Sequence, residues 1–101
     1  MATYKLSNHA DKDFESIYIY GVQTFGLDQA EAYAADLETR FEQLANHPLL
    51  YPAIDHVQPG YRLSVYSSHA IYYRINNDGV LTVRILRSQN VDTALSQAEN
   101  L

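Results

Sequence analysis

The sequence predicts an α+β fold in which an antiparallel helical hairpin packs on one face of a three- to four-stranded antiparallel sheet. The first observation is an alternation of apolar and polar residues between Gly60 and Arg87, which is expected to form three consecutive strands with one buried face. The second is the three- and four-residue spacing of apolar residues before Pro48, which is typical of amphipathic helices. The alternating apolar positions are Tyr61, Leu63, Val65, Ile71, Tyr73, Ile75, Leu81, Val83 and Ile85.

The first elements have clear boundary signals. Tyr4-Lys5-Leu6 is a candidate strand that is too short to stand alone, so it should pair with an edge of the sheet. Ser7 is expected to cap a helix from Asn8 to Phe25, because its hydroxyl can accept a hydrogen bond from a free backbone N–H. Gly26 should end this helix, since glycine readily takes the left-handed conformation after a helix C-terminus. The buried stripe of this helix is expected to contain Ala10, Phe14, Ile17, Gly21 and Phe25.

A second helix should follow after a very short turn. Asp28 and Glu31 form a capping-box-like start, and His47-Pro48 ends the helix because the residue before a proline is pushed out of the helical region. The two helices then form a hairpin that covers the apolar face of the sheet. With 101 residues, the chain is expected to be a single domain over residues 1–101. The residues expected in its core are Phe14, Ile17, Leu37, Phe41, Leu63, Ile71, Tyr73, Val83 and Ile85.

The turns between the three strands predict a register. Asn77-Asp78-Gly79 favours a three-residue loop with Gly79 in the left-handed conformation, and a similar loop is expected at Ser67-Ser68-His69. The polar face should then carry arginines and tyrosines. This face is either solvated, with arginine stems covering the tyrosine rings, or a contact surface for an acidic or aromatic partner. The predicted cross-strand pairs on it are Tyr72 with Arg84, Arg74 with Thr82, and Arg62 with Arg74.

The composition narrows the possible functions. The absence of cysteine excludes a disulfide framework and a thiolate site, and the histidines have no metal-ligand spacing, so no metal or cofactor is expected. We find no bilayer-spanning apolar run and no secretion signal, so the expected location is the cytoplasm, without a membrane partner. The net charge of −5 argues against direct, sequence-specific nucleic-acid binding. The four histidines are His9, His47, His56 and His69.

The order of these elements and several motifs resemble the RelE/ParE superfamily of toxins from bacterial type II toxin–antitoxin systems, and most closely its ParE branch. The turn before the segment 69–74 departs from the family, because many members carry proline and glycine where this chain has Tyr66-Ser67-Ser68. Many members are also basic, whereas this chain is acidic. The matching motifs are Leu6-Ser7, the segment 41–48, Gly60-Tyr61-Arg62, the segment 69–74, the segment 84–87 and Asn90-Val91-Asp92.

The resemblance implies a toxin that stops growth by binding and inhibiting DNA gyrase and is neutralised in a hetero-oligomer with a ParD-like antitoxin. Two alternatives stay open: a RelE-like ribosome-dependent mRNA endoribonuclease, and a non-toxic antitoxin-binding module. The nuclease needs an acid and a base, but arginine cannot abstract a proton at neutral pH, and His69 beside a turn is expected to be structural. We therefore assign no catalytic residue, and inhibition of a target by binding is preferred over the nuclease.

The candidate binding residues lie in the strands and in the tail. For the target they are Arg84, Arg87, Gln89 and Asn90, on an arginine-rich strand followed by a polar tail that is expected to be free to contact another protein. For the antitoxin they are Arg62, Arg74 and Arg84, as anchors for acidic residues of a segment that folds on binding as a helix or an added strand.

Overall fold

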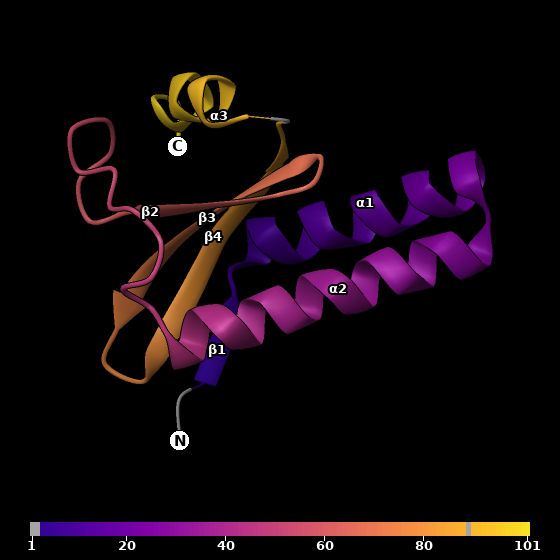
Figure 1. Cartoon of the computed structure of the whole chain (residues 1–101), viewed down its shortest axis with the longest axis horizontal. Helices are drawn as coiled ribbons and strands as arrows, with labels where there is room; N and C mark the ends of the chain where they lie inside the picture. The colour runs from indigo at the N-terminus through magenta and orange to yellow at the C-terminus, as the bar shows by residue number, and fades with distance from the viewer. Residues whose placement is uncertain (1–2, 89) are drawn as a thin grey trace.

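A four-stranded sheet lies at the centre of the fold, and helices cover both of its faces. The computed structural model describes residues 3–88 and 90–101. Figure 1 shows α1 and α2 side by side as an antiparallel hairpin that extends past one end of the sheet, with α3 apart from them. The predicted α+β class is thus confirmed. The elements are β1 (Thr3–Leu6), α1 (Asn8–Phe25), α2 (Leu27–Asn46), β2 (Arg62–Tyr66), β3 (His69–Asn76), β4 (Gly79–Arg87) and α3 (Val91–Ala98).

The helical hairpin begins and turns where the sequence predicts. The Ser7 hydroxyl accepts a hydrogen bond from the Ala10 N–H at 3.0 Å and donates to the Val83 carbonyl at 2.7 Å, so it both caps α1 and fixes it to β4. Gly26, at φ 94°, is the C-cap of α1 and also the N-cap of α2. The predicted capping box at Asp28 is therefore wrong. Because the connection is one residue long, Asp28 already lies in the first turn of α2, where the helix dipole favours its charge.

The sheet has the order β1-β4-β3-β2. Strands β2, β3 and β4 form the predicted antiparallel meander, but β1 pairs with β4 in parallel, so the sheet as a whole is mixed rather than antiparallel. Strands β2, β3 and β4 alternate in direction, and β4 is parallel to β1. Strand β2 therefore runs in the direction of β1, and β4, two hairpins later, does so again.

The register differs from the prediction because both hairpins have two-residue turns, Ser67-Ser68 and Asn77-Asp78, in place of three-residue loops. A β-bulge then shifts the register between Tyr72 and Tyr73, which restores the predicted pairing of Tyr72 with Arg84. Two predicted pairs are wrong. Arg74 lies opposite Leu81 and Arg62 lies opposite Tyr73.

Gly79 has the positive φ that the turn predicts, although it lies in β4 rather than in a loop, and a close contact also requires glycine there. It begins β4 and pairs with Thr3 of β1. A Cβ atom at Gly79, where φ is 149°, would lie 2.0 Å from the Thr3 carbonyl oxygen. The parallel strand can approach this closely only because the residue has no side chain.

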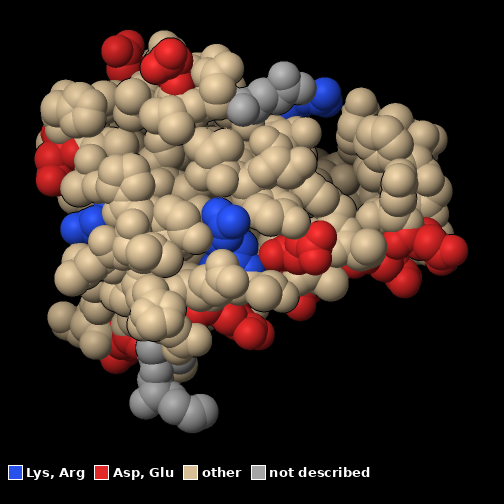
Figure 2. Space-filling view, in the orientation of Figure 1, with Lys and Arg blue, Asp and Glu red and all other residues tan. Residues whose placement is uncertain are grey.

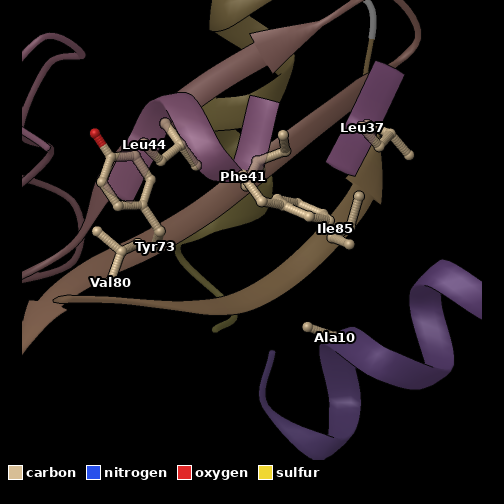
Figure 3. Packing of buried hydrophobic residues seen from close by; sticks show 8 residues of the cluster. Ala10, Leu37, Phe41, Leu44, Tyr73, Val80 and Ile85 are labelled. Atoms are coloured by element: carbon tan, nitrogen blue, oxygen red, sulfur yellow. The ribbon is translucent and has the colours of Figure 1, made fainter. Parts of the chain in front are cut away.

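The main core lies between the helical hairpin and the sheet. Figure 3 shows side chains from α1, α2, β3 and β4 converging there, with Phe41 pointing toward Ile85. Of the nine residues predicted in the core, six are buried, whereas Phe14, Ile17 and Val83 are only partly buried. Val83 lies at the bulge, and the two α1 residues border a hollow described below. The core residues of this cluster are Ala10, Leu37, Phe41, Leu44, Ile71, Tyr73, Val80 and Ile85.

A second core covers the opposite face of the sheet, which the sequence predicted to be polar. Tyr72 is fully buried there, and its hydroxyl donates to the Ala94 carbonyl at 2.7 Å, while burial raises its pKa to about 12. The tail is therefore not free, because α3 packs on this face. Leu63 belongs to this second core rather than to the first. The buried members are Ile54, Leu63, Ala70, Tyr72, Ala94 and Ala98.

Candidate functional site

A hollow of about 410 Å³ opens between the outer halves of α1 and α2 and the turn that joins β2 to β3. Figure 2 shows a hollow between the far end of the hairpin and the rest of the molecule, with basic atoms at its rim. We call this hollow the hairpin pocket. Its walls are mainly apolar, with polar groups at one end. The lining residues used below are Tyr20, Phe25, Tyr33, Asp36, His69 and Arg87.

The pocket exists because the hairpin is longer than the sheet that it covers. Phe14 and Ile17 contact the core on one side and the pocket on the other, which explains their partial burial. Beyond them Phe25 is 63% exposed and Tyr20 is 50% exposed, so the predicted buried stripe of α1 ends before Phe25. Large apolar side chains are thus left in solvent at the open end of a concave site, which is a common feature of protein-binding surfaces.

The polar end of the pocket is built from Tyr33, His69 and Arg87. The Tyr33 hydroxyl lies 2.7 Å from Nδ1 of His69 and donates to the Tyr66 carbonyl at 3.3 Å. A phenol has one proton, so both contacts are satisfied when the Nδ1–H of His69 donates to the phenol oxygen. Nε2 is then the acceptor of the ring. Burial lowers the pKa of His69 and the charge of Arg87 lowers it further, while burial raises the pKa of Tyr33.

Arg87 connects the end of β4 to α1. Its guanidinium carbon lies 5.7 Å from the centre of the Tyr20 ring, a cation–π distance, and it lowers the pKa of the Tyr20 phenol. Arg87 is exposed and lines the pocket. Over residues 3–88 and 90–101, the one ion pair within 4 Å joins two other residues, Arg84 and Asp13. Among the described residues, no carboxylate lies within 4 Å of the Arg87 guanidinium, so its charge faces the pocket without an ion-pair partner.

Two of the other residues predicted to bind the target, Arg84 and Asn90, have side chains that are engaged within the chain. Arg84 donates from Nε and Nη2 to the Asp13 carboxylate at 2.7 and 3.0 Å, so both donors are engaged within the chain. The Asn90 side chain caps α3 by accepting from the Thr93 N–H at 2.9 Å. Gln89 lies outside the described residues. Their roles in target binding stay predictions.

The residues predicted to bind the antitoxin do not form one surface. Arg62 donates to the Tyr51 carbonyl at 2.7 Å and sits at the start of β2, while Arg74 is exposed further along β3. Arg84 is on β4 and is bound to Asp13. The two-residue turn between β2 and β3 separates Arg62 from Arg74, which the predicted register had paired. Their role in antitoxin binding is also still a prediction.

Sequence reasoning missed a second arginine site, at Arg40 of α2. Its guanidinium carbon lies 5.2 Å from the Tyr51 ring and 4.9 Å from the Tyr66 ring, and its Nη1 donates to Ser64 at 2.7 Å. Arg40 thereby fastens α2 to the edge strand β2. Asp36, one turn before Arg40 in α2, accepts a hydrogen bond from the Tyr66 hydroxyl at 3.1 Å.

The described side chains do not favour a metal centre or a membrane span. Within the described ranges, no group of three or more His, Cys, Asp or Glu side chains is placed to hold a metal ion. None of the helices built from these residues is both long and apolar enough to cross a bilayer. What the site offers is an apolar hollow lined also by three tyrosines, Asp36, His69 and the exposed Arg87, an arrangement suited to binding a partner.

Comparison with known proteins identifies the family. The sequence profile described as "ParE toxin of type II toxin-antitoxin system, parDE" matches residues 4–91. The chain belongs to the ParE toxin family. It is 35% identical to Toxin ParE1 of Caulobacter vibrioides over 74% of this chain and 78% of the relative, and 33% identical to Toxin ParE1 of Mycobacterium tuberculosis over 88% and 91%.

A solved structure of a ParE-containing system has the same fold. The match to a chain of "Chromosomal ParDE TA system from P. aeruginosa" has a TM-score of 0.71 and covers 88% of this chain and 98% of the other, with 22% sequence identity. The predicted ParE branch of the RelE/ParE superfamily is thus confirmed, and the chain is a ParE-type toxin of a type II toxin–antitoxin system.

Proposed function

We propose that this ParE-type toxin blocks growth by binding and inhibiting DNA gyrase in the cytoplasm, and that a ParD-like antitoxin neutralises it in a hetero-oligomer. Family membership supports both halves of the proposal, because the matched profile describes toxins of parDE systems. The observation that carries the antitoxin half is the hairpin pocket, an apolar hollow of about 410 Å³ with large exposed side chains at its open end.

The proposed occupant of the pocket is an amphipathic segment of the antitoxin. Phe25 and Tyr20 would contact its apolar anchors, and Arg87 would bind an acidic residue beside them. A segment that is disordered alone and folds into a groove uses this combination of apolar anchors and charged rim contacts. Arg62, Arg74 and Arg84 remain proposed further anchors for acidic residues.

The proposed target surface is the end of β4 and the start of α3. Arg87 and Asn90 are exposed there. Arg84 is held in place by Asp13, and Gln89 completes the proposed set. Support comes from the family and from the exposed guanidinium of Arg87, since arginine side chains often dominate protein interfaces through bidentate hydrogen bonds and stacking.

An endoribonuclease is the second candidate, and one observation favours it. His69, Tyr33 and Arg87 meet at the polar end of the pocket, and such a group could in principle move a proton beside a cation. Ribosome-dependent mRNA cleavage with normal supercoiling would support this candidate. Growth that continues when the chain is expressed without an antitoxin would support a non-toxic binding module.

The antitoxin half is tested by two matched substitutions of exposed apolar residues. Phe25, 63% exposed, lines the pocket, whereas Leu50, 67% exposed, is not among its lining residues. Phe25→Asp should abolish co-purification with the antitoxin encoded beside the toxin, and Leu50→Asp should leave it intact. Both variants should keep the thermal midpoint of the parent, because neither side chain is buried. Equal co-purification of the two variants would refute the proposed docking site.

A further inference from the structure

The polar end of the hairpin pocket contains a group that can couple partner binding to pH. His69 and Arg87 are directly opposite each other in the β3–β4 ladder, and both line the pocket. Directly opposed residues on antiparallel strands project on the same face with their Cβ atoms about 5 Å apart. An imidazole and a guanidinium therefore face the same pocket occupant.

The contacts of His69 indicate which ring nitrogen takes up the proton. Nδ1 lies 2.7 Å from the Tyr33 hydroxyl, and the Tyr33 hydroxyl donates to the Tyr66 carbonyl. These contacts are kept when the ring is neutral with Nδ1–H and also when it is fully protonated. Protonation thus occurs at Nε2 and breaks none of them.

In the unbound chain the surroundings favour the neutral ring. Burial of the imidazole is the main reason, and the charge of Arg87 adds to it, so the pKa of His69 lies below its ordinary value of 6.5. Burial raises the pKa of Tyr33 and of Tyr66, so both phenols stay neutral near pH 7. The titratable and charged groups that face His69 are Tyr18 and Tyr20 of α1, Tyr33 and Asp36 of α2, Tyr66 of β2 and Arg87 of β4, with Arg40 stacked beyond Tyr66.

We propose that the partner places a carboxylate between Arg87 and His69, and that His69 takes up one proton from solvent as the partner binds. This inference rests on the proposed antitoxin docking in the hairpin pocket. A carboxylate pairs with Arg87 and attracts a proton to Nε2, so the bound state holds the proton more tightly than the free state. An entirely apolar occupant would do the opposite, because it would bury the ring further without adding a negative charge.

The direction in which affinity changes with pH distinguishes an occupant with a carboxylate from an entirely apolar one. When binding raises the pKa of His69, binding strengthens as the pH falls through the interval between the free and bound pKa values, by at most about tenfold per pH unit for one proton. When binding lowers this pKa, binding weakens as the pH falls. Because only the sign of the change is compared, the test needs no knowledge of the partner's sequence.

The experiment uses purified antitoxin from the reading frame next to the toxin's own. Its affinity for the toxin is measured by calorimetry between pH 5.5 and 7.5, and the His69 imidazole is titrated by NMR in the free chain and in the complex. We expect affinity to rise by about threefold to tenfold as the pH falls over this range, with a higher His69 pKa in the complex. His69→Asn should remove this increment, and His56→Asn, at an exposed loop histidine, should keep it. Arg87→Gln should also remove it.

The alternative outcomes are distinct. A stable complex whose affinity is flat, or falls, with acidification overturns the carboxylate and proton uptake but leaves the proposed docking intact. The NMR titration separates the same two outcomes without any variant, so a poorly folded His69→Asn chain would not prevent the test. Failure to form a complex at any pH refutes the proposed function itself, and this inference with it.

Discussion

Asp13 joins α1 to the part of β4 that lies beyond its pairing with β1. Its carboxylate accepts from Arg84 at 2.7 and 3.0 Å and from the Ile85 backbone N–H at 3.1 Å. Asp13→Ala should lower the free energy of unfolding by about 1–3 kcal/mol, because a largely buried edge N–H and a guanidinium lose their acceptor. Glu15→Ala, at an exposed position two residues further along α1, should change it little. Urea denaturation of the two variants gives the comparison, and equal midpoints would argue against this role.

Thr82 has a buried hydroxyl without a hydrogen-bond partner among the described residues, and its side chain is fully buried. Thr82→Val removes the hydroxyl and keeps the shape of the side chain. The variant should be more stable by about 1 kcal/mol, since a buried unsatisfied polar group costs about 1–3 kcal/mol. A loss of stability in thermal unfolding would mean that the hydroxyl has a partner, such as an ordered water molecule.

His69 should make the folded chain sensitive to acid. Its pKa is lower in the folded state than the ordinary value of 6.5, chiefly through burial, so the unfolded state binds the proton first as the pH falls. The contribution of the neutral His69 to the free energy of unfolding is therefore fully present above about pH 6.5. It is lost as the pH falls through the folded-state pKa of His69. Unfolding free energies measured between pH 7.5 and 5 should fall in the parent more than in His69→Gln. A parent chain that gains stability over this range would contradict the neutral, partly buried histidine.

Single residues predicted the structure correctly where it depends on residues that are close in the sequence. Ser7 and Gly26 were predicted correctly, because a helix cap depends on a few neighbouring backbone groups. Gly79 was recognised as a turn glycine. Its close contact with the Thr3 backbone was not predicted, because Thr3 is 76 positions earlier in the chain. Nothing near Tyr33 in the sequence indicated its contact with His69, which is 36 positions further along the chain.

At the scale of elements, α3 is the part that differs most from its prediction. It buries Ala94 and Ala98 against the sheet, and its Ala94 carbonyl accepts from the buried Tyr72 hydroxyl. Truncation after Ser88 should therefore unfold or strongly destabilise the chain, rather than remove target binding from an intact fold. The expected cost exceeds about 3 kcal/mol, because it uncovers an aromatic core residue and removes its acceptor. A truncated chain with the parent's thermal midpoint would show that α3 is dispensable.

The periodic patterns predicted the main elements and their order, because the helical and strand periods are written along the chain. The pattern could not indicate the two-residue turns, since each shifts the register between strands by one residue. It also could not indicate the bulge near Val83, which changes the alternation within β4, so that Val80 and Ile85 both enter the main core. It also could not show that the second face of the sheet is covered. The small residues Ala94 and Ala98 that cover it are weak apolar signals in a polar tail.

At the scale of the whole molecule, the candidate site exists because the two helices of the hairpin are longer than the strands that they cover. The helices of 18 and 20 residues extend past strands of at most nine, so their outer halves enclose a pocket that no local motif indicates. Of the predicted site residues, Arg87 alone lines this pocket among those that the structure describes. The family could be predicted because its motifs are contiguous, whereas the pocket needs residues from four separate parts of the chain.

The central functional claim is inhibition of DNA gyrase by a chain whose exposed Arg87 lies at the contact surface. The most direct measurement adds the purified chain to a gyrase supercoiling assay and, in parallel, to translating ribosomes with intact mRNA. We predict that the parent chain inhibits supercoiling and that mRNA stays intact. With Arg87→Ala, inhibition should weaken by about tenfold or more, which corresponds to an interface residue that contributes more than about 1.4 kcal/mol to binding. Normal supercoiling together with ribosome-dependent mRNA cleavage would contradict this claim.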